Sequence, residues 1–156
     1  MKYLSTILTM AAVFGLATTP GCNNRTEAEM GKACKLSEEE KKNDETIETT
    51  VYDMANDKES HTCKKVSVRG VPISTSKTLY HERAGLFIVL EEDTKTITTR
   101  YYGQDDDFKI AKIDSELKAM IKLGKKVKVE GRFNGAYVKI DYLTINDVTY
   151  TQQEQK

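Results

Sequence analysis

The stretch from Ser115 to Tyr150 constrains the fold most, because its apolar pattern changes from helical to extended within one short segment. In SELKAMIKL the apolar residues recur three and four positions apart, which predicts a helix that Asp114 or Ser115 would cap. Gly124 then supplies the residue tolerant of positive φ that a helix C-terminus requires. KKVKVEGRF alternates apolar with charged residues, which predicts a half-buried strand.

This strand ends at Asn134-Gly135, a dipeptide typical of type I′ turns. A type I′ turn reverses the chain within two residues. We therefore expect YVKIDYLTINDVTY, from Tyr137, to return antiparallel to the preceding strand as one long second strand.

A related pattern occurs earlier, in KKVSVRGVPI from Lys64. The valines before Gly70 alternate as in a strand, and Val71 and Ile73 resume inward after it with the odd shift that a β-bulge produces. A bulged strand of this kind can bend and serve both sides of a small barrel. KKVSVRG and KKVKVEG (from Lys125) differ only at their fourth and sixth positions. Either a duplication or two amphipathic strands with the same requirements would explain this, and we favour the second.

Two further strands lie between these segments. GLFIVL, from Gly85, is apolar on both faces, as expected of a central strand covered on each side. Residues Lys95–Tyr102 alternate and predict a strand with one wet face. We expect loops over Ser74–Ala84 and over Gly103–Asp107, and a turn over Glu91–Thr94.

Short helices are predicted in the segment that precedes Lys64. Ser37 and Glu40 form a capping-box pattern that would start a helix over Glu38–Asn43. Apolar residues at helical spacing favour a second helix over Ile47–Met54, although the threonine-rich TIETTVY also fits a strand.

Residues 1–21 have the composition of a targeting segment, with one lysine followed by an apolar run too short for a comfortable membrane span. The run ends at Cys22, and TTPGC resembles the lipobox of bacterial lipoproteins, whose cysteine is lipidated and becomes the mature N-terminus. Thr19 stands where lipoboxes usually carry leucine. The alternative is an ordinary secretory signal, cut near Ala17 or Gly21, with a free Cys22.

The lipoprotein resemblance implies a location in the cell. Acyl chains on Cys22 would anchor the protein to the membrane of a bacterial cell envelope. Asn23, rather than aspartate, follows the cysteine, and the resemblance then favours the outer membrane, facing the periplasm or the cell surface. The expected division of the chain is a signal peptide (1–21), a flexible tether (22–33), a helical extension (34–63), a barrel (64–150) and a polar tail (151–156).

The chain has three cysteines. With Cys22 assigned to the lipobox, Cys34 and Cys63 remain as an even pair in an oxidising compartment, which favours a disulfide. Two isolated thiols are the alternative. Their spacing lacks the close pairs of a zinc site.

The predicted order of elements is three strands, one helix and two strands. This is the layout of the OB-fold, a five-stranded Greek-key barrel. The glycine-interrupted first strand, KKVKVEG after a glycine-stopped helix and the final YVKIDYLTI strand resemble the small OB-fold domains of bacterial envelope lipoproteins. These include families named for their similarity to the anticodon-binding OB-fold. The predicted fold class is thus mainly β, with a helix between the third and fourth barrel strands.

We find no pattern of a catalytic site or cofactor site, and we expect a protein that is not an enzyme. His61 and His81 lack partners at triad or zinc-site spacing. Asp105-Asp106-Asp107 lacks the spaced ligands of a calcium loop, so we expect no metal. The 24 basic and 24 acidic residues balance, and loss of Lys2 with the leader leaves 23 against 24. A balanced charge argues against a nucleic-acid partner.

OB-folds bind ligands on the face of their second and third strands, flanked by two loops. Aromatic rings beside arginines suit stacking on sugars or bases. The predicted ligand residues are Tyr80, His81, Arg83, Thr98, Arg100, Tyr102 and Tyr137. We expect a binding module for an envelope protein or glycan. The alternatives are an exclusion or stress-response lipoprotein that occupies a receptor, and a periplasmic oligosaccharide or nucleotide binder.

Overall fold

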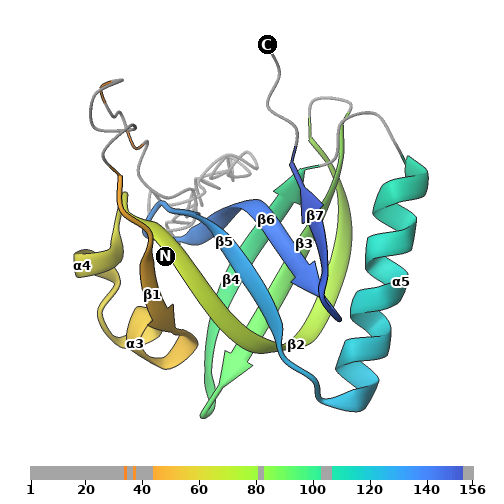
Figure 1. Ribbon diagram of the computed structural model, residues 1–156, viewed down its shortest axis with the longest axis horizontal. Helices are drawn as coiled ribbons and strands as arrows, with labels where there is room; N and C mark the ends of the chain where they lie inside the picture. Colours follow the sequence, from red (N-terminus) through yellow and green to blue (C-terminus); the bar gives the residue numbers. More distant parts are fainter. Residues whose placement is uncertain (1–33, 35–36, 38–43, 81–82, 103–106, 153–156) are drawn as a thin grey trace, which may run out of the picture.

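The computed structural model describes residues 34, 37, 44–80, 83–102 and 107–152 (Figure 1). The expected leader, the tether and the helix over Glu38–Asn43 lie outside the described residues.

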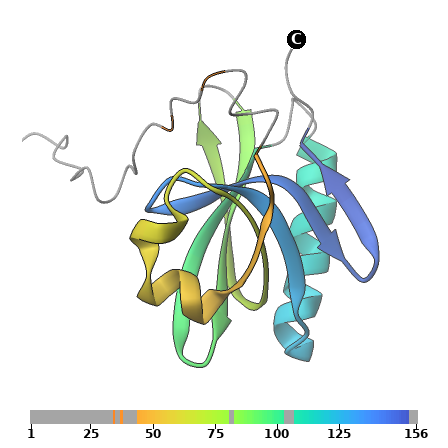
Figure 2. The same cartoon turned by 60° about the vertical axis from the view of Figure 1, so that its left-hand side comes forward.

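The described part of the chain forms one seven-stranded sheet, curled into a barrel beside a long helix (Figures 1 and 2). Its elements are β1 (Ile47–Thr50), α3 (Val51–Asn56), α4 (Lys58–His61), β2 (Lys65–Tyr80), β3 (Arg83–Glu92), β4 (Lys95–Tyr102), α5 (Asp107–Leu123), β5 (Val127–Phe133), β6 (Tyr137–Ile145) and β7 (Val148–Thr151).

Five strands close the barrel in the order β2-β3-β4-β6-β5, with β5 pairing back to β2. Four of these contacts are antiparallel, and the contact between β4 and β6 is parallel. The helix α5 joins the third barrel strand to the fourth. This order is that of the OB-fold, so the predicted fold class is confirmed.

Strand β2 serves both sides of the barrel, as predicted. Its residues 65–70 pair with β5 and its residues 71–80 pair with β3. The change of partner falls at Gly70, where a Cβ would lie 2.7 Å from Cγ2 of Val51. Val51, the first residue of α3, can therefore pack against β2 at this point only because position 70 has no side chain.

The bulge of β2 lies later than predicted. The register with β3 shifts between Pro72 and Ser74, and Ile73 is 42% exposed, while Val71 lies opposite the outward residue Glu91, so neither side chain points inward as expected. The loop expected over Ser74–Ala84 is also wrong, because the strand continues to Tyr80. Pairing with the apolar β3 holds this serine- and threonine-rich segment extended.

The two similar heptapeptides pair with each other. Val68 of β2 lies opposite Val129 of β5, and each glycine lies opposite a valine, Gly70 by Val127 and Gly131 by Val66. Along β5 every second side chain is buried, which confirms the predicted alternation. The two heptapeptides thus face one core, and each has its glycine at a position that a neighbouring element approaches closely.

Gly131 allows β5 and β6 to approach closely. A Cβ at this position would lie 2.0 Å from the carbonyl oxygen of Lys139. The register also shifts here, between Glu130 and Gly131. Any side chain at position 131 would therefore push β6 away from β5.

The turns differ from the prediction. Asn134 does not have positive φ, and its side-chain oxygen accepts hydrogen bonds from the backbone N–H groups of Ala136 (3.0 Å) and Tyr137 (2.9 Å), so the hairpin is an Asx turn and not type I′. Paired positive φ angles, which type I′ requires, occur instead at Asp93-Thr94 and at Asn146-Asp147. The second of these turns divides the expected long strand into β6 and β7.

The helix α5 begins at Asp107, well before the expected start at Ser115. Asp114 is therefore not a cap. It lies buried inside the helix, where its carboxylate accepts hydrogen bonds from the Thr75 hydroxyl and the Lys118 ammonium, both at 2.8 Å. Burial raises the pKa of Asp114, but these two hydrogen bonds outweigh burial and hold the pKa below its usual value. The carboxylate thus links α5 to β2.

The helix ends at the predicted glycine. Gly124 has φ +60°, and its N–H donates to the carbonyl of Ile121 while the N–H of Lys125 donates to that of Met120. These two bonds form a Schellman motif.

The segment expected as a helix over Ile47–Met54 is a strand followed by a helix. Residues Ile47–Thr50 form β1, parallel to β2, and α3 begins at Val51. The Thr50 side chain caps α3 by accepting from the N–H of Asp53 at 3.0 Å. Threonine favours extended backbone in this stretch, while Val51 and Met54 are fully buried.

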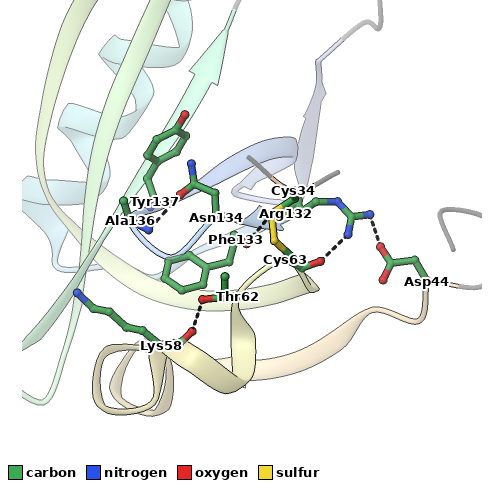
Figure 3. Close-up of a disulfide and its surroundings, with 10 residues drawn as sticks. All are labelled: Cys34, Asp44, Lys58, Thr62, Cys63, Arg132, Phe133, Asn134, Ala136 and Tyr137. Carbon is green, nitrogen blue, oxygen red and sulfur yellow. Dashed lines mark hydrogen bonds and ion pairs between the residues drawn. A yellow bond between two sulfur atoms is a disulfide. The ribbon is translucent and has the colours of Figure 1, made fainter. Parts of the chain in front are cut away.

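Cys34 and Cys63 form the predicted disulfide, with Cα atoms 5.2 Å apart (Figure 3). The backbone N–H of Cys63 donates to the Phe133 carbonyl at 2.7 Å. Arg132 donates to the Cys63 carbonyl at 2.7 Å and also pairs with Asp44. The bridge therefore joins the N-terminal segment to the end of β5.

We predict that Gly131→Ala lowers the free energy of unfolding by about 3 kcal/mol, since the new methyl group overlaps backbone. Gly124→Ala is the matched control, because it adds the same methyl group in open space at positive φ and costs about 1 kcal/mol. Urea unfolding followed by circular dichroism measures both. Equal losses would contradict the close approach of β5 and β6.

We predict that removal of the disulfide, by Cys34→Ser with Cys63→Ser, lowers the free energy of unfolding by about 3 to 4 kcal/mol. The 29-residue separation that the bridge closes sets this magnitude. Urea unfolding of the unsubstituted chain in reductant provides the control and should match the double variant. A double variant as stable as the oxidised chain would disprove the role of the bridge.

Candidate functional site

The outer surface of β3, β4 and β6 carries the candidate site. Inward side chains of these strands fill the core, and the alternate residues point outward and are partly or fully exposed. Cross-strand register places Phe87 beside Arg100, and Arg100 beside Lys139. We name this surface the Arg100 face, and it consists of Phe87, Thr98, Arg100, Tyr102, Tyr137 and Lys139.

Two aromatic rings hold the guanidinium group of Arg100. Its Cζ atom lies 4.5 Å from the ring centre of Phe87 and 3.7 Å from the ring centre of Tyr137. Strand β4 runs between β3 and β6, so one ring reaches the arginine from each neighbouring strand. Cation–π contacts of this kind contribute about 0.5 to 2 kcal/mol each. The arginine is therefore fixed in position by its neighbours.

The charge of Arg100 has no partner within the described chain. Its Nε atom is buried and lacks a hydrogen-bond acceptor there, and none of the described carboxylates pairs with it. Arg132, on the adjacent side of the barrel, instead pairs with Asp44. A held cation without a counter-charge is suited to bind an anionic or electron-rich group of a ligand.

Tyr137 is neutral under physiological conditions. Burial raises its pKa, the neighbouring Tyr102 raises it further, and the positive charge of Arg100 opposes these effects without cancelling them. The phenol therefore carries no negative charge that would neutralise Arg100.

The Asx turn positions this tyrosine. Asn134 accepts from the N–H groups of Ala136 and Tyr137 and so fixes the backbone where β6 begins (Figure 3). The disulfide lies beside the same turn, through the contact between Cys63 and Phe133. The disulfide therefore joins the N-terminal segment to the turn that positions Tyr137.

The structure brings together four of the predicted ligand residues, namely Thr98, Arg100, Tyr102 and Tyr137, on two adjacent strands. Tyr80 and Arg83 pair in register at the end of the β2–β3 hairpin. The side chains of these two residues and the whole of His81 lie outside the described part of the molecule.

Sequence reasoning missed two members of the Arg100 face, Phe87 and Lys139. The strand GLFIVL was expected to be covered on each side, but Phe87 is only half buried, with Arg100 against its ring. The apolar outward position of Phe87 was the available signal. Lys139 had no such signal, because its place beside Arg100 depends on the parallel contact between β4 and β6.

His61 has a local role. Its Nδ1 atom lies 2.7 Å from the Asp57 carbonyl and its Nε2 atom lies 3.1 Å from the Thr49 hydroxyl, so it joins α4 to β1. Among the described residues, no group of three or more His, Cys, Asp or Glu side chains could hold a metal ion. None of the helices within the described ranges is long and apolar enough to span a membrane. Asp107, expected in the acidic loop, is the first residue of α5.

No known protein family model matches the sequence, and no curated protein matches it. Among solved structures, the fold is similar to a chain in the crystal structure of yeast Stn1 and Ten1, with a TM-score of 0.44 and 10% sequence identity. The similarity covers 70% of this chain and 64% of the length of the other. The OB-fold is therefore identified by the order of the barrel strands.

We predict that Arg100 and Tyr137 are energetically coupled. A double-mutant cycle with Arg100→Gln and Tyr137→Leu should give a coupling free energy of about 0.5 to 1 kcal/mol in urea unfolding. Tyr142→Leu is the matched control, because Tyr142 is an exposed tyrosine of the same strand and should not couple to Arg100. A cycle with Tyr137 that closes to zero would refute the stacking.

Proposed function

We propose that this protein is a non-enzymatic binding module of the bacterial cell envelope, anchored through lipid at Cys22, whose barrel binds a glycan on the Arg100 face. The observation that carries the proposal is the contact of Arg100 with Phe87 and Tyr137 on the outer surface of an OB-fold barrel. Aromatic faces and a fixed planar donor are the groups that recognise sugars and other ring-shaped ligands.

The surroundings of the Arg100 face favour a glycan over a protein partner. Register places Ser74 and Ser76 of β2 beside the outward residues of β3, and both serines are exposed. Thr98 and Tyr102 add further hydroxyl groups on β4. Hydroxyl groups donate and accept hydrogen bonds, as the hydroxyl groups of sugars require.

Large exposed apolar side chains of the described residues lie elsewhere. They are Ile47, Tyr52, Ile73, Phe108, Leu123, Tyr142 and Val148. Protein interfaces are typically built around an exposed apolar or aromatic core that a polar rim surrounds. The protein-binding alternatives, among them occupation of a receptor, receive no comparable support from this face.

The proposed address rests on the leader and on Cys22. The disulfide between Cys34 and Cys63 is consistent with an oxidising compartment such as the periplasm or the cell surface. A lipid anchor would keep the barrel beside the polysaccharides of the envelope, so that a modest affinity would suffice.

The test uses the whole chain, expressed in a bacterial host and purified from its membranes in detergent. We predict an intact mass that corresponds to an acylated chain beginning at Cys22, and loss of the protein from membranes in the Cys22→Ser variant. The purified protein, returned to lipid vesicles, should retain material from a bacterial envelope polysaccharide fraction. Periodate treatment of that fraction should abolish the retention, and protease treatment should not.

Two results would contradict the proposal. An unmodified chain in the soluble fraction would disprove the address. Retention that is lost after protease but survives periodate would show that the partner is a protein.

A further inference from the structure

The row of residues through the Arg100 face carries neighbouring positive charges, because Lys139 lies between Arg100 of β4 and Arg132 of β5, and Arg132 pairs with Asp44. Arg100 and Lys139 are cross-strand partners in the parallel contact between β4 and β6, and both point outward. Like charges directly opposite one another on a sheet destabilise it. A pair of this kind on neighbouring strands therefore favours the presence of an anion between the two side chains.

The protein itself does not supply this anion within its described part. Neither Arg100 nor Lys139 belongs to an ion pair with any described carboxylate. Glu91, a partly exposed glutamate at an outward position of β3, lies four residues along the strand from Phe87, or about 13 Å. Glu91 forms no ion pair with Arg100.

We propose that Arg100 and Lys139 together bind the oxyanion of an acidic glycan, a carboxylate or a phosphate, on the Arg100 face. This inference rests on the proposed function and adds the chemical class of the ligand. The rings of Phe87 and Tyr137 hold the guanidinium group in place, and its terminal nitrogens donate a pair of parallel hydrogen bonds to two oxygen atoms of the anion.

Lys139 has the second role. Its exposed ammonium group contributes a point charge that attracts the same anion without fixing its orientation. The hydroxyl groups of Thr98 and Tyr102 border the pair and contact the sugar that bears the anion. Arg100 should therefore determine affinity and geometry, and Lys139 should determine mainly the dependence on salt.

The test measures binding of three probes to the protein in lipid vesicles by isothermal titration calorimetry, at low and at physiological ionic strength. The probes are an oligogalacturonate, which carries carboxylates, a dextran phosphate and unmodified dextran. The variants are Arg100→Gln, Lys139→Gln and Tyr137→Leu, with Arg69→Gln as the matched control, because Arg69 is an exposed arginine of β2 whose cross-strand partner, Lys128, already pairs with Glu130. Circular dichroism verifies that each variant is folded.

We expect at least one acidic probe to bind, and dextran to bind far more weakly. Arg100→Gln should weaken this binding about tenfold or more, as loss of charge-assisted hydrogen bonds requires. Lys139→Gln should weaken it about threefold and reduce its salt dependence, and Arg69→Gln should leave it unchanged. Preference for the oligogalacturonate or for the dextran phosphate identifies the anion as carboxylate or phosphate.

Three results would overturn the inference. Equal weakening by Arg69→Gln would show non-specific attraction between charges. If dextran binds as tightly as the acidic probes and Tyr137→Leu abolishes that binding, the ligand is a neutral glycan at the proposed site. Failure of all three probes to bind would reject the acidic glycan, and a partner sensitive to protease would then reject the proposed function as well.

Discussion

The close approach of β5 and β6 at Gly131 is the contact on which the rest of the barrel depends. Because position 131 has no side chain, the carbonyl of Lys139 can lie against the backbone of β5. β5 pairs with the first half of β2 along one edge and with β6 along the other, so the second edge of β6 faces β4. The barrel then closes through three register pairs between β4 and β6.

Barrel closure and the candidate site are the same contact. The three register pairs are Thr98 with Tyr137, Thr99 with Val138, and Arg100 with Lys139. The middle pair is buried and completes the core, while the other two point outward and contribute four residues of the Arg100 face. A change that opens this contact would therefore disturb stability and binding together, and the N-terminal segment, held by the disulfide beside the Asx turn, supports it from one end.

The sequence predicted the elements whose structure depends on residues close together in the chain. The alternation of β5 followed from periodicity, the glycine stop of α5 from the tolerance of glycine for positive φ, and the order of the barrel strands from the resemblance to the OB-fold. The type of turn at Asn134 was predicted wrongly, because the asparagine side chain competes with the backbone for the N–H groups of the turn. The early start of α5 was missed because Asp114 resembles a cap, although it bonds to Thr75 on a distant strand. Arg100 and Tyr137 could be predicted as members of one face, but their stacking and the neighbouring Lys139 depend on a parallel contact between strands far apart in sequence.

Amide NMR shows whether the ligand binds at the contact between β4 and β6. Oligogalacturonate would be titrated into the isotopically labelled Cys22→Ser chain, which lacks the lipid anchor. We expect the perturbed amides to cluster on β3, β4 and the start of β6, around Arg100. Perturbations confined to α5, or to β1 and α3, would place the ligand on another surface and rule out the Arg100 face.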